Sequence, residues 1–285
     1  MDVGAVGLNR SSHMKAVTNM LAWGLAGALC VLTFHKAMAA QAITTQAPPT
    51  RGSPVVVELF TSEGCSSCPP ADQLLAKLEA EQSISNVEII ALEQHVDYWN
   101  NGGWVDPFSS STATLRQYAY ASALSNGNAY TPQMVVDGQN EFIGSRTGQA
   151  RSIIEQAGTR KKTEVTLSTT EGAKGEKFHV SVGAIPNLSS GDTPEIWVAI
   201  TETGLHSNVR GGENSGEDLY HAAVVRKMWK IGAVKESGAT SFSSDTSVKI
   251  DRGWKRENTR VVVFVQGKKS KKILGAGSYR LQPQS

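Results

Sequence analysis

The sequence predicts an α/β domain at residues 54–160, followed by an antiparallel all-β, sandwich-like domain at residues 163–283. Three observations support this division. Short apolar runs alternate with helical patterns over residues 54–160, in the order β-α-β-α-β-β-α. Beyond Thr163, helical periodicity is nearly absent and alternating strand patterns recur. The net charge also changes sign, from −7 over residues 40–157 (5 basic, 12 acidic) to +7 over residues 158–285 (20 basic, 13 acidic).

The N-terminus has the features of a secretory signal peptide. An uncharged apolar run, Met20–Phe34, follows two basic residues and precedes the small-residue pattern Ala37-Met38-Ala39. This run is shorter than the about 20 residues that a transmembrane helix needs. We therefore expect a signal peptide at 1–39 and a linker at 40–53. The protein should be exported, either periplasmic or secreted, with no membrane contact after cleavage.

The elements of the first half follow from periodicity and turn residues. The apolar run Val55–Phe60 lies between a proline and a turn, which predicts a buried strand. A helix should follow Pro69-Pro70, because proline is tolerated in the first helical turn. The remaining predicted elements are a strand at Val87–Leu92, a helix at Thr112–Leu124, a hairpin of Gln133–Val136 and Glu141–Ile143, and a helix at Arg146–Ala157.

The second half reads as a series of strands separated by glycine, serine, aspartate and proline. The predicted strands are Val165–Thr169, Phe178–Gly183, Ile196–Thr201, Ala222–Ile231, Lys249–Asp251 and Val261–Gln266. The run Lys268–Lys272 holds four lysines and is typical of a solvated turn between edge strands.

Composition excludes some classes of function. The 285 residues carry a formal charge of +2, whereas a nucleic-acid-binding domain is normally strongly basic. Removing residues 1–39 leaves 25 basic and 25 acidic side chains, and the opposite charges of the two halves predict that they attract each other or face oppositely charged partners. Cleavage also removes Cys30, so the mature chain keeps only Cys65 and Cys68.

These two cysteines form a C-x-x-C motif between a predicted buried strand and a predicted helix. A helix N-terminus stabilises a thiolate through its partial positive charge and its free N–H groups. We expect Cys65 to be the exposed attacking thiol and Cys68 to be the resolving thiol. The sequence therefore indicates thiol–disulfide exchange.

Two other interpretations of the cysteine pair remain open. It can be a structural disulfide in a binding or scaffold protein, or a pair of thiolates that carries a soft ion such as Cu(I). Half of a zinc site is disfavoured because there is no second cysteine pair. His95, His179, His206 and His221 are scattered in the sequence, so we expect no metal site and no cofactor.

Several longer segments carry a family resemblance. They are Glu58–Asp72 (ELFTSEGCSSCPPAD), His95–Phe108 (HVDYWNNGGWVDPF), Arg116–Tyr120 (RQYAY), Tyr130–Gly138 (YTPQMVVDG), and Arg210–Asn214 (RGGEN) with His221 and Val224-Val225-Arg226. Together they resemble the bacterial secreted family DUF1223, a domain of unknown function placed in the thioredoxin-like superfamily. The resemblance implies a thioredoxin-like fold for the first half and an exported location, but no substrate.

The resemblance also implies roles for three residues. Pro132 matches the cis-proline that thioredoxin-like folds hold beside the C-x-x-C motif, and Thr131 matches the residue whose backbone pairs with substrate. Glu58 resembles the buried thioredoxin carboxylate that moves protons for the inner thiol. Its spacing to Cys65 is one residue longer, however, so a structural role for Glu58 stays open.

Two further features are a pair of tryptophans after the second predicted strand and a glycine-rich loop in the second half. Trp99 and Trp104 follow the second strand, and we expect them either to wall the substrate site or to pack beneath a long loop. The loop Arg210–Asn214 lacks the spacing of a phosphate-binding loop, so we expect it to pack against the other domain.

We therefore expect an exported thiol–disulfide oxidoreductase that acts on protein or small thiol and disulfide substrates. The catalytic residues would be Cys65, Cys68, Pro132 and Glu58, and the substrate-binding residues would be Thr131, Trp99 and Trp104. The sequence predicts no nucleic-acid partner. It does not give the direction of the redox reaction or the oligomeric state.

Overall fold

The structure is a computed structural model that describes residues 52–170, 176–185, 191–234 and 241–283. The predicted signal peptide at 1–39 and nearly all of the predicted linker at 40–53 lie outside these residues. None of the helices in the described ranges combines the length and the apolarity needed to cross a bilayer.

The first half has the element order that the periodicity predicts. It comprises β1 (Ser53–Thr61), α1 (Pro69–Glu81), β2 (Val87–His95), α2 (Ser111–Leu124), β3 (Gln133–Val136), β4 (Asn140–Ile143) and α3 (Thr147–Gly158). Two prolines open α1 and the Ser110 side chain caps α2, so the sequence signals for both helix starts are local. The chain is thus mixed α/β, with three α-helices among the described residues.

The second half is built of strands, with one short 3-10 turn, η1 (Arg256–Asn258). The strands are β5 (Val165–Thr170), β6 (Glu176–Val182), β7 (Pro194–Glu202), β8 (Leu205–Asn208), β9 (Asp218–His221), β10 (Val224–Ala233), β11 (Phe242–Val248), β12 (Thr259–Gly267) and β13 (Ile273–Arg280). The strand predicted at Lys249–Asp251 is wrong. The strand in this region is β11, which ends just before it, and its serine-rich sequence has weak strand propensity and was therefore missed. The short β8–β9 hairpin was not predicted.

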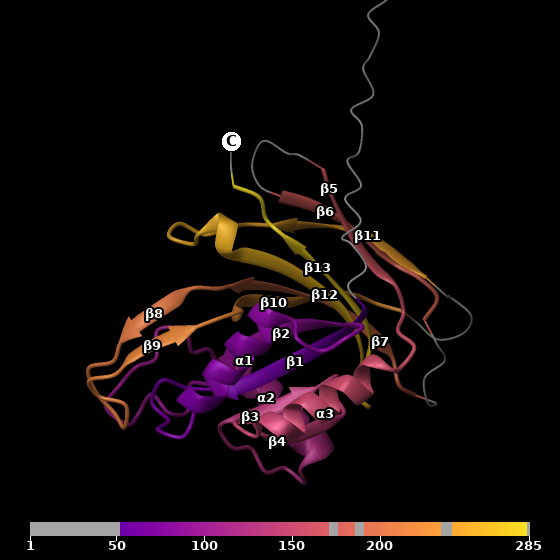
Figure 1. Cartoon of the computed structure of the whole chain (residues 1–285). Coiled ribbons are helices and arrows are strands. Elements are labelled where there is room, and N and C mark those ends of the chain that lie inside the picture. The colour runs from indigo at the N-terminus through magenta and orange to yellow at the C-terminus, as the bar shows by residue number, and fades with distance from the viewer. Residues whose placement is uncertain (1–51, 171–175, 186–190, 235–240, 284–285) are drawn as a thin grey trace, which may run out of the picture. The chain divides into compact units, whose positions relative to one another are not determined.

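One eight-stranded sheet contains strands of both halves, in the order β13-β12-β7-β10-β2-β1-β3-β4. The two halves meet where β10 pairs in parallel with β2, through Val224 and Glu93. Within the sheet, β2 also pairs in parallel with β1, and β3 and β4 continue it in antiparallel fashion. The sheet therefore runs across the boundary that the sequence predicts at residues 160–163 (Figure 1).

Helices and a second sheet cover this large sheet. Helices α1 and α3 pack on one face of β1–β3, and α2 packs on the other. The three-stranded sheet β11-β6-β5 packs on the strands β7, β12 and β13. Because the opposite face of β7 and β12 is continuous with the α2 face of β1 and β2, the small sheet shares its side with α1 and α3.

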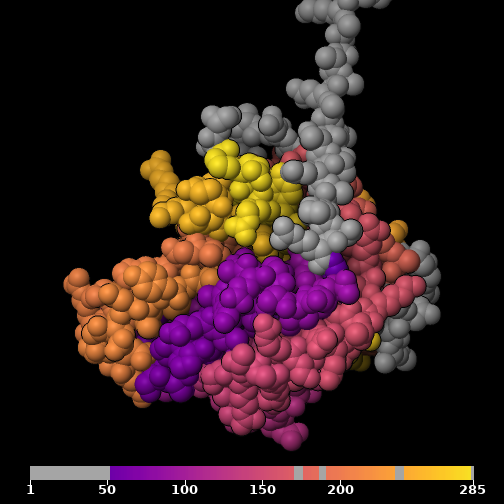
Figure 2. All heavy atoms as spheres, viewed as in Figure 1, coloured from indigo at the N-terminus to yellow at the C-terminus, as the bar shows by residue number. Residues whose placement is uncertain are grey.

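The β8–β9 hairpin and its connecting loop lie next to the start of α1, where the C-x-x-C motif is found. Helix α1 packs along β9. Figure 2 shows the orange surface of this hairpin against the violet surface of the α1 region. The second half of the chain thus reaches the motif of the first half.

Candidate functional site

The C-x-x-C motif occupies the turn between β1 and α1. A disulfide joins Cys65 and Cys68, whose Cα atoms are 5.5 Å apart. Cys68 is the N-cap of α1, so the pair lies at the positive end of the helix dipole. The structure corrects the expectation of an exposed Cys65, because only 1% of Cys65 and none of Cys68 is accessible.

The loop at 210–214 between β8 and β9 covers the motif. The Asn214 amide donates to the backbone carbonyls of Glu63 (2.8 Å) and Cys65 (3.0 Å). The carboxylate of Glu213 accepts the backbone N–H of Ser66 at 3.0 Å. A Cβ at Gly211 would lie 2.2 Å from the carbonyl oxygen of Gly103, so this close approach requires glycine. The loop therefore packs against the first half, as the sequence predicts.

Both predicted tryptophans lie at the motif. The Cβ of Trp99 lies 3.3 Å from the position of a Cβ on Gly64, and its indole N–H donates to the Thr131 hydroxyl at 2.8 Å. The indole N–H of Trp104 donates to the Glu63 carboxylate at 2.7 Å. The Thr131–Pro132 peptide bond is cis. The structure thus brings Trp99, Trp104 and Thr131 into one contact network with the turn that holds the cysteines.

Glu58 is not part of this network. Successive side chains of β1 point to opposite faces, and the neighbours Val57 and Leu59 pack against α1, so Glu58 faces α2. There its carboxylate accepts hydrogen bonds from Arg116 (2.5 and 2.7 Å), from Gln94 (2.6 Å) and from the Tyr120 hydroxyl. The expectation that Glu58 serves the inner thiol is therefore wrong.

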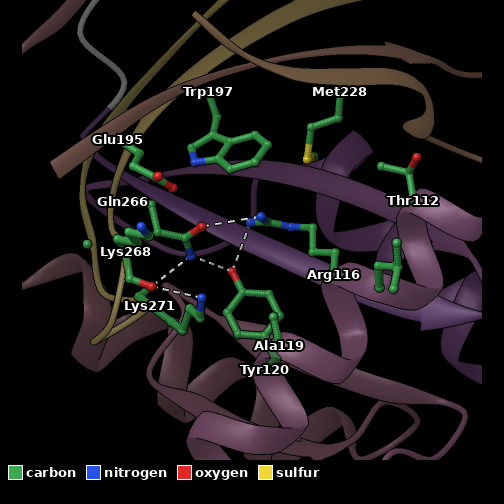
Figure 3. A pocket seen from close by; sticks show the side chains of 12 residues that line it. Thr112, Arg116, Ala119, Tyr120, Glu195, Trp197, Met228, Gln266, Lys268 and Lys271 are labelled. Carbon is green, nitrogen blue, oxygen red and sulfur yellow. Dashed lines mark hydrogen bonds between the residues drawn. The ribbon is translucent and has the colours of Figure 1, made fainter. Parts of the chain in front are cut away.

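A pocket of about 310 Å³ lies beside this Glu58 cluster, between α2 and the strands β7, β10 and β12 (Figure 3). Its lining includes Arg116, Tyr120, Trp197, Gln266 and, from the predicted solvated turn, Lys268 and Lys271. Arg116 also donates to Gln266 at 3.2 Å. Neither cysteine lines this pocket, so it is separate from the disulfide.

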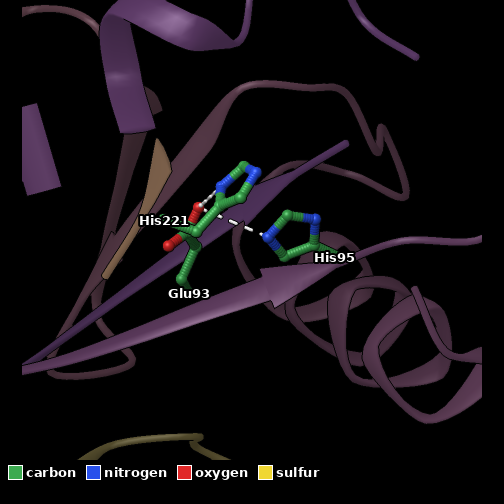
Figure 4. A group of neighbouring side chains, drawn as sticks. All are labelled: Glu93, His95 and His221. Atoms are coloured by element: carbon green, nitrogen blue, oxygen red, sulfur yellow. Dashed lines mark hydrogen bonds and ion pairs between the residues drawn. The ribbon is translucent and has the colours of Figure 1, made fainter. Parts of the chain in front are cut away.

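A cluster of buried acids and histidines lies beneath the motif, on the α1 face of the sheet. Glu93 contacts both His221 (Nδ1 to Oε1, 2.8 Å) and His95 (Nε2 to Oε1, 3.3 Å), as Figure 4 shows. The outer nitrogen of His95 contacts Asp106 at 2.7 Å, and that of His221 contacts Glu63 at 3.1 Å. All five residues are at most 3% exposed.

The expectation of scattered histidines is wrong for two of the four. His95 ends β2 and His221 ends β9, and their ring centroids are 4.7 Å apart. His179 and His206 remain apart, each exposed and each facing a surface aspartate. The meeting of His95 with His221 depends on long-range strand placement, which residue spacing does not encode.

Another buried acid, Asp72, lies close to the cysteines. Asp72 follows Cys68 by one helical turn, its backbone N–H donates to the Cys68 carbonyl at 3.2 Å, and its carboxyl accepts the Thr61 hydroxyl at 2.6 Å. Residues four apart in a helix share one face, which places Asp72 on the side of Cys68. In the sequence Asp72 stands out only as a negative charge that flanks the C-x-x-C motif, and no pattern predicts its burial beside Thr61.

Burial and mutual contacts shift the ionisation of this region. Burial, and then the charge of Glu93, raises the pKa of Asp72 to about 7. Burial opposes the charge on Glu93, but its two histidine neighbours lower its pKa to about 2. Burial also opposes a charge on His221, but Glu93 and Glu63 raise its pKa to about 9. Asp72 is thus the acid of this region that changes charge near neutral pH.

Comparison with solved structures supports the fold. The chain is similar to protein AGR_C_4864 from Agrobacterium tumefaciens, with a TM-score of 0.60 and 22% identity, over 83% of this chain and 100% of the other. It is also similar to HBP35 of Porphyromonas gingivalis, with a TM-score of 0.59 and 18% identity, over 82% of this chain and 77% of the other. At these identities the likeness concerns the fold alone.

No curated protein matches the chain in sequence. A family model does match, over residues 56–266, which hold the disulfide, the covering loop and the buried histidine cluster. The chain therefore belongs to the family described as protein of unknown function (DUF1223).

Proposed function

We propose that this protein is an exported, thioredoxin-like thiol–disulfide oxidoreductase that uses Cys65 and Cys68. The observation that carries the proposal is the position of the pair. It bridges the end of β1 and the first turn of α1, where the helix N-terminus favours a thiolate. The element order from β1 to α3 supports the thioredoxin-like assignment.

In the reducing direction, the Cys65 thiolate attacks one sulfur of a substrate disulfide. A mixed disulfide forms and one substrate thiolate leaves. Cys68 then attacks the sulfur of Cys65, which releases the second substrate thiolate and closes the protein disulfide. The substrate gains two electrons and the protein loses two. The oxidising direction is the reverse of these steps, on protein or small thiol substrates.

Asp72 takes the proton-transfer role that the family resemblance implied for Glu58. It lies one helical turn from Cys68, on the same face of α1, and its pKa of about 7 allows it to exchange a proton at neutral pH. A thiol of ordinary pKa near 8.5 can lose its proton to such a group when it becomes the resolving nucleophile. Asp72 acts through Cys68 and is therefore a positioning and proton-accepting residue.

The substrate would bind where Trp99, Trp104 and Thr131 surround the turn. Access requires a movement of the 210–214 loop, because Asn214 holds the carbonyls on both sides of Gly64 and the disulfide is buried. Exported location rests on the apolar run at Met20–Phe34 and its small-residue cleavage pattern. N-terminal sequencing of the mature protein tests that location, and we expect cleavage after Ala39.

A redox titration against glutathione and dithiothreitol tests the activity. The full chain carries Cys30→Ala, so that only the pair titrates. We expect a potential above about −300 mV and a mixed disulfide on Cys65 in the Cys68→Ser variant, but none on Cys68 in the Cys65→Ser variant. A pair that is unreactive in the folded protein, or whose potential is lower than this, would overturn the proposal.

The burial of both cysteines favours a second candidate function. In that case the disulfide is structural, and the protein is a binding or scaffold protein. The same titration decides between the two, because structural disulfides resist reduction by the glutathione pool.

A further inference from the structure

We propose that Glu93, His95 and His221 bind a divalent transition-metal ion of the zinc class beneath the C-x-x-C turn. The site stands apart from the redox proposal, since neither cysteine belongs to it. One ligand atom from each of the three residues lies within 4.8 Å of the others (Figure 4). Two histidines and one carboxylate form a ligand set that zinc and ferrous iron both accept in proteins.

In each of the two histidines one ring nitrogen faces Glu93, which we call the inward atom, and the other, outward nitrogen faces a further carboxylate. Asp106 faces Nδ1 of His95 and also accepts the backbone N–H of Glu63 (2.9 Å), so it acts as a hydrogen-bond acceptor. Glu63 faces Nε2 of His221 and also accepts the indole N–H of Trp104. Each imidazole can therefore donate its outward N–H to a carboxylate. This carboxylate–histidine arrangement is the one that orients metal-binding histidines.

The inward nitrogens of both histidines point to one oxygen of Glu93, and only that of His221 is hydrogen-bonded to it in the described structure. Nε2 of His95 has no hydrogen bond in the described structure, although it is fully buried. Nδ1 of His221 points to the same oxygen of Glu93 that lies 3.3 Å from His95. Ligand atoms bound tetrahedrally to zinc at 2.0–2.1 Å are about 3.3 Å apart. The distances from Oε1 of Glu93 to the two ring nitrogens, 2.8 and 3.3 Å, fit a shared cation after a small outward shift.

The negative charges around the two histidines also favour a bound cation. Glu93, Asp106 and Glu63 bring three carboxylates into the interior, and within the described residues their ion pairs are with histidine alone. One divalent cation held by two neutral imidazoles would place two positive charges among these carboxylates and use both inward lone pairs. Phe108 packs against both rings and shields the site from water.

The test measures metal on the full chain with the disulfide intact and without reductant. Because the ligands are buried, Zn²⁺ is supplied during growth and, in a second preparation, during refolding. We expect one zinc per chain by mass spectrometry of the metal, and Co²⁺ in its place should give the visible absorption of a nitrogen- and oxygen-ligated site. Zinc should also raise the melting temperature of the wild type.

The variants define the ligands. His95→Gln and His221→Gln should abolish stoichiometric binding, whereas His206→Gln, which changes an exposed histidine that also faces an aspartate, should leave it intact. Asp106→Asn should weaken zinc affinity about 10–100-fold, because it removes the group that orients His95. The Cys65→Ser/Cys68→Ser double variant should retain the metal, which separates this site from any thiolate site.

Three results would overturn the proposal. The first is a folded wild type, by circular dichroism, that holds no stoichiometric zinc in either preparation. The second is zinc that stays bound in the folded His95→Gln variant. The third is zinc that is lost with the cysteines. Because the redox titration uses the cysteines and this test uses the histidines, failure of one leaves the other standing.

Discussion

The two faces of the sheet at β1 and β2 both bury carboxylates, but they neutralise them differently. On the α2 face, Glu58 is paired with Arg116, a group that stays charged at every pH the protein meets. On the α1 face, Glu93, Glu63 and Asp106 face histidines, and Asp72 has no ion-pair partner among the described residues. A permanent cation makes a cluster structural, whereas titratable partners leave it able to exchange protons or bind a cation.

The largest expected effect comes from breaking the ion pair between Glu58 and Arg116. Arg116→Met leaves the Glu58 carboxylate buried without its cation, and we expect it to lower the free energy of unfolding by about 3–5 kcal/mol. Denaturant unfolding measures this. The double variant Arg116→Met/Glu58→Gln should recover most of the loss, and Arg151→Met, an exposed arginine that contacts Ser83, should change stability by less than about 0.5 kcal/mol. A loss below about 1 kcal/mol for Arg116→Met would show that the pair is not structural.

The second effect tests the titratable face through Asp72, in the presence of a chelator. Its folded pKa of about 7 lies above the ordinary value of 3.8, so the unfolded chain releases this proton more readily. The buried Asp72 carboxylate therefore destabilises the folded state only when it is charged. This effect is absent below about pH 4, grows as pH rises, and is complete above about pH 7. Asp72→Asn keeps an acceptor for Thr61 and removes the titration.

We expect Asp72→Asn to raise the free energy of unfolding by about 2–4 kcal/mol at pH 8, since one pKa unit corresponds to about 1.4 kcal/mol. At pH 4 the variant and the wild type should be nearly equal. Urea unfolding at both pH values measures the difference. A gain that is the same at both values would mean that Asp72 does not titrate in this range, and it would remove Asp72 from the proposed proton transfer.

The smallest effect concerns the loop that covers the disulfide. Asn214→Ala removes two hydrogen bonds from buried carbonyls, and we expect a loss of about 1–2 kcal/mol in stability. Each 1.4 kcal/mol by which the loop opens more easily raises the open population about tenfold, so dithiothreitol should reduce the disulfide about tenfold faster. Glu217→Gln changes an exposed side chain of the same connection between β8 and β9 and serves as the control. Equal reduction rates for Asn214→Ala and the wild type would show that the loop does not limit access.

Local patterns predicted most elements, because helix periodicity and turn residues act over a few positions. Long-range placement was not available from them. The pairing of β10 with β2 at Val224 and Glu93 joins the two halves into one sheet, and no periodicity in the sequence predicts it. Glu58 shows the same limit on a smaller scale, since its partner Arg116 lies 58 residues away on α2. Glu93 and His95 are two residues apart on β2, so their position on one face of the strand could be predicted. The position of His221 beside them could not.

The covering loop imposes an order on maturation. Cys65 and Cys68 belong to the first quarter of the chain, whereas Asn214 and Glu213, which hold the loop against them, come much later in the sequence. Before the loop packs against the turn, the sulfurs are accessible to an oxidant, so the disulfide forms most easily at an early stage of folding. In a chain that folds completely while reduced, an oxidant reaches the two thiols only when the 210–214 loop opens.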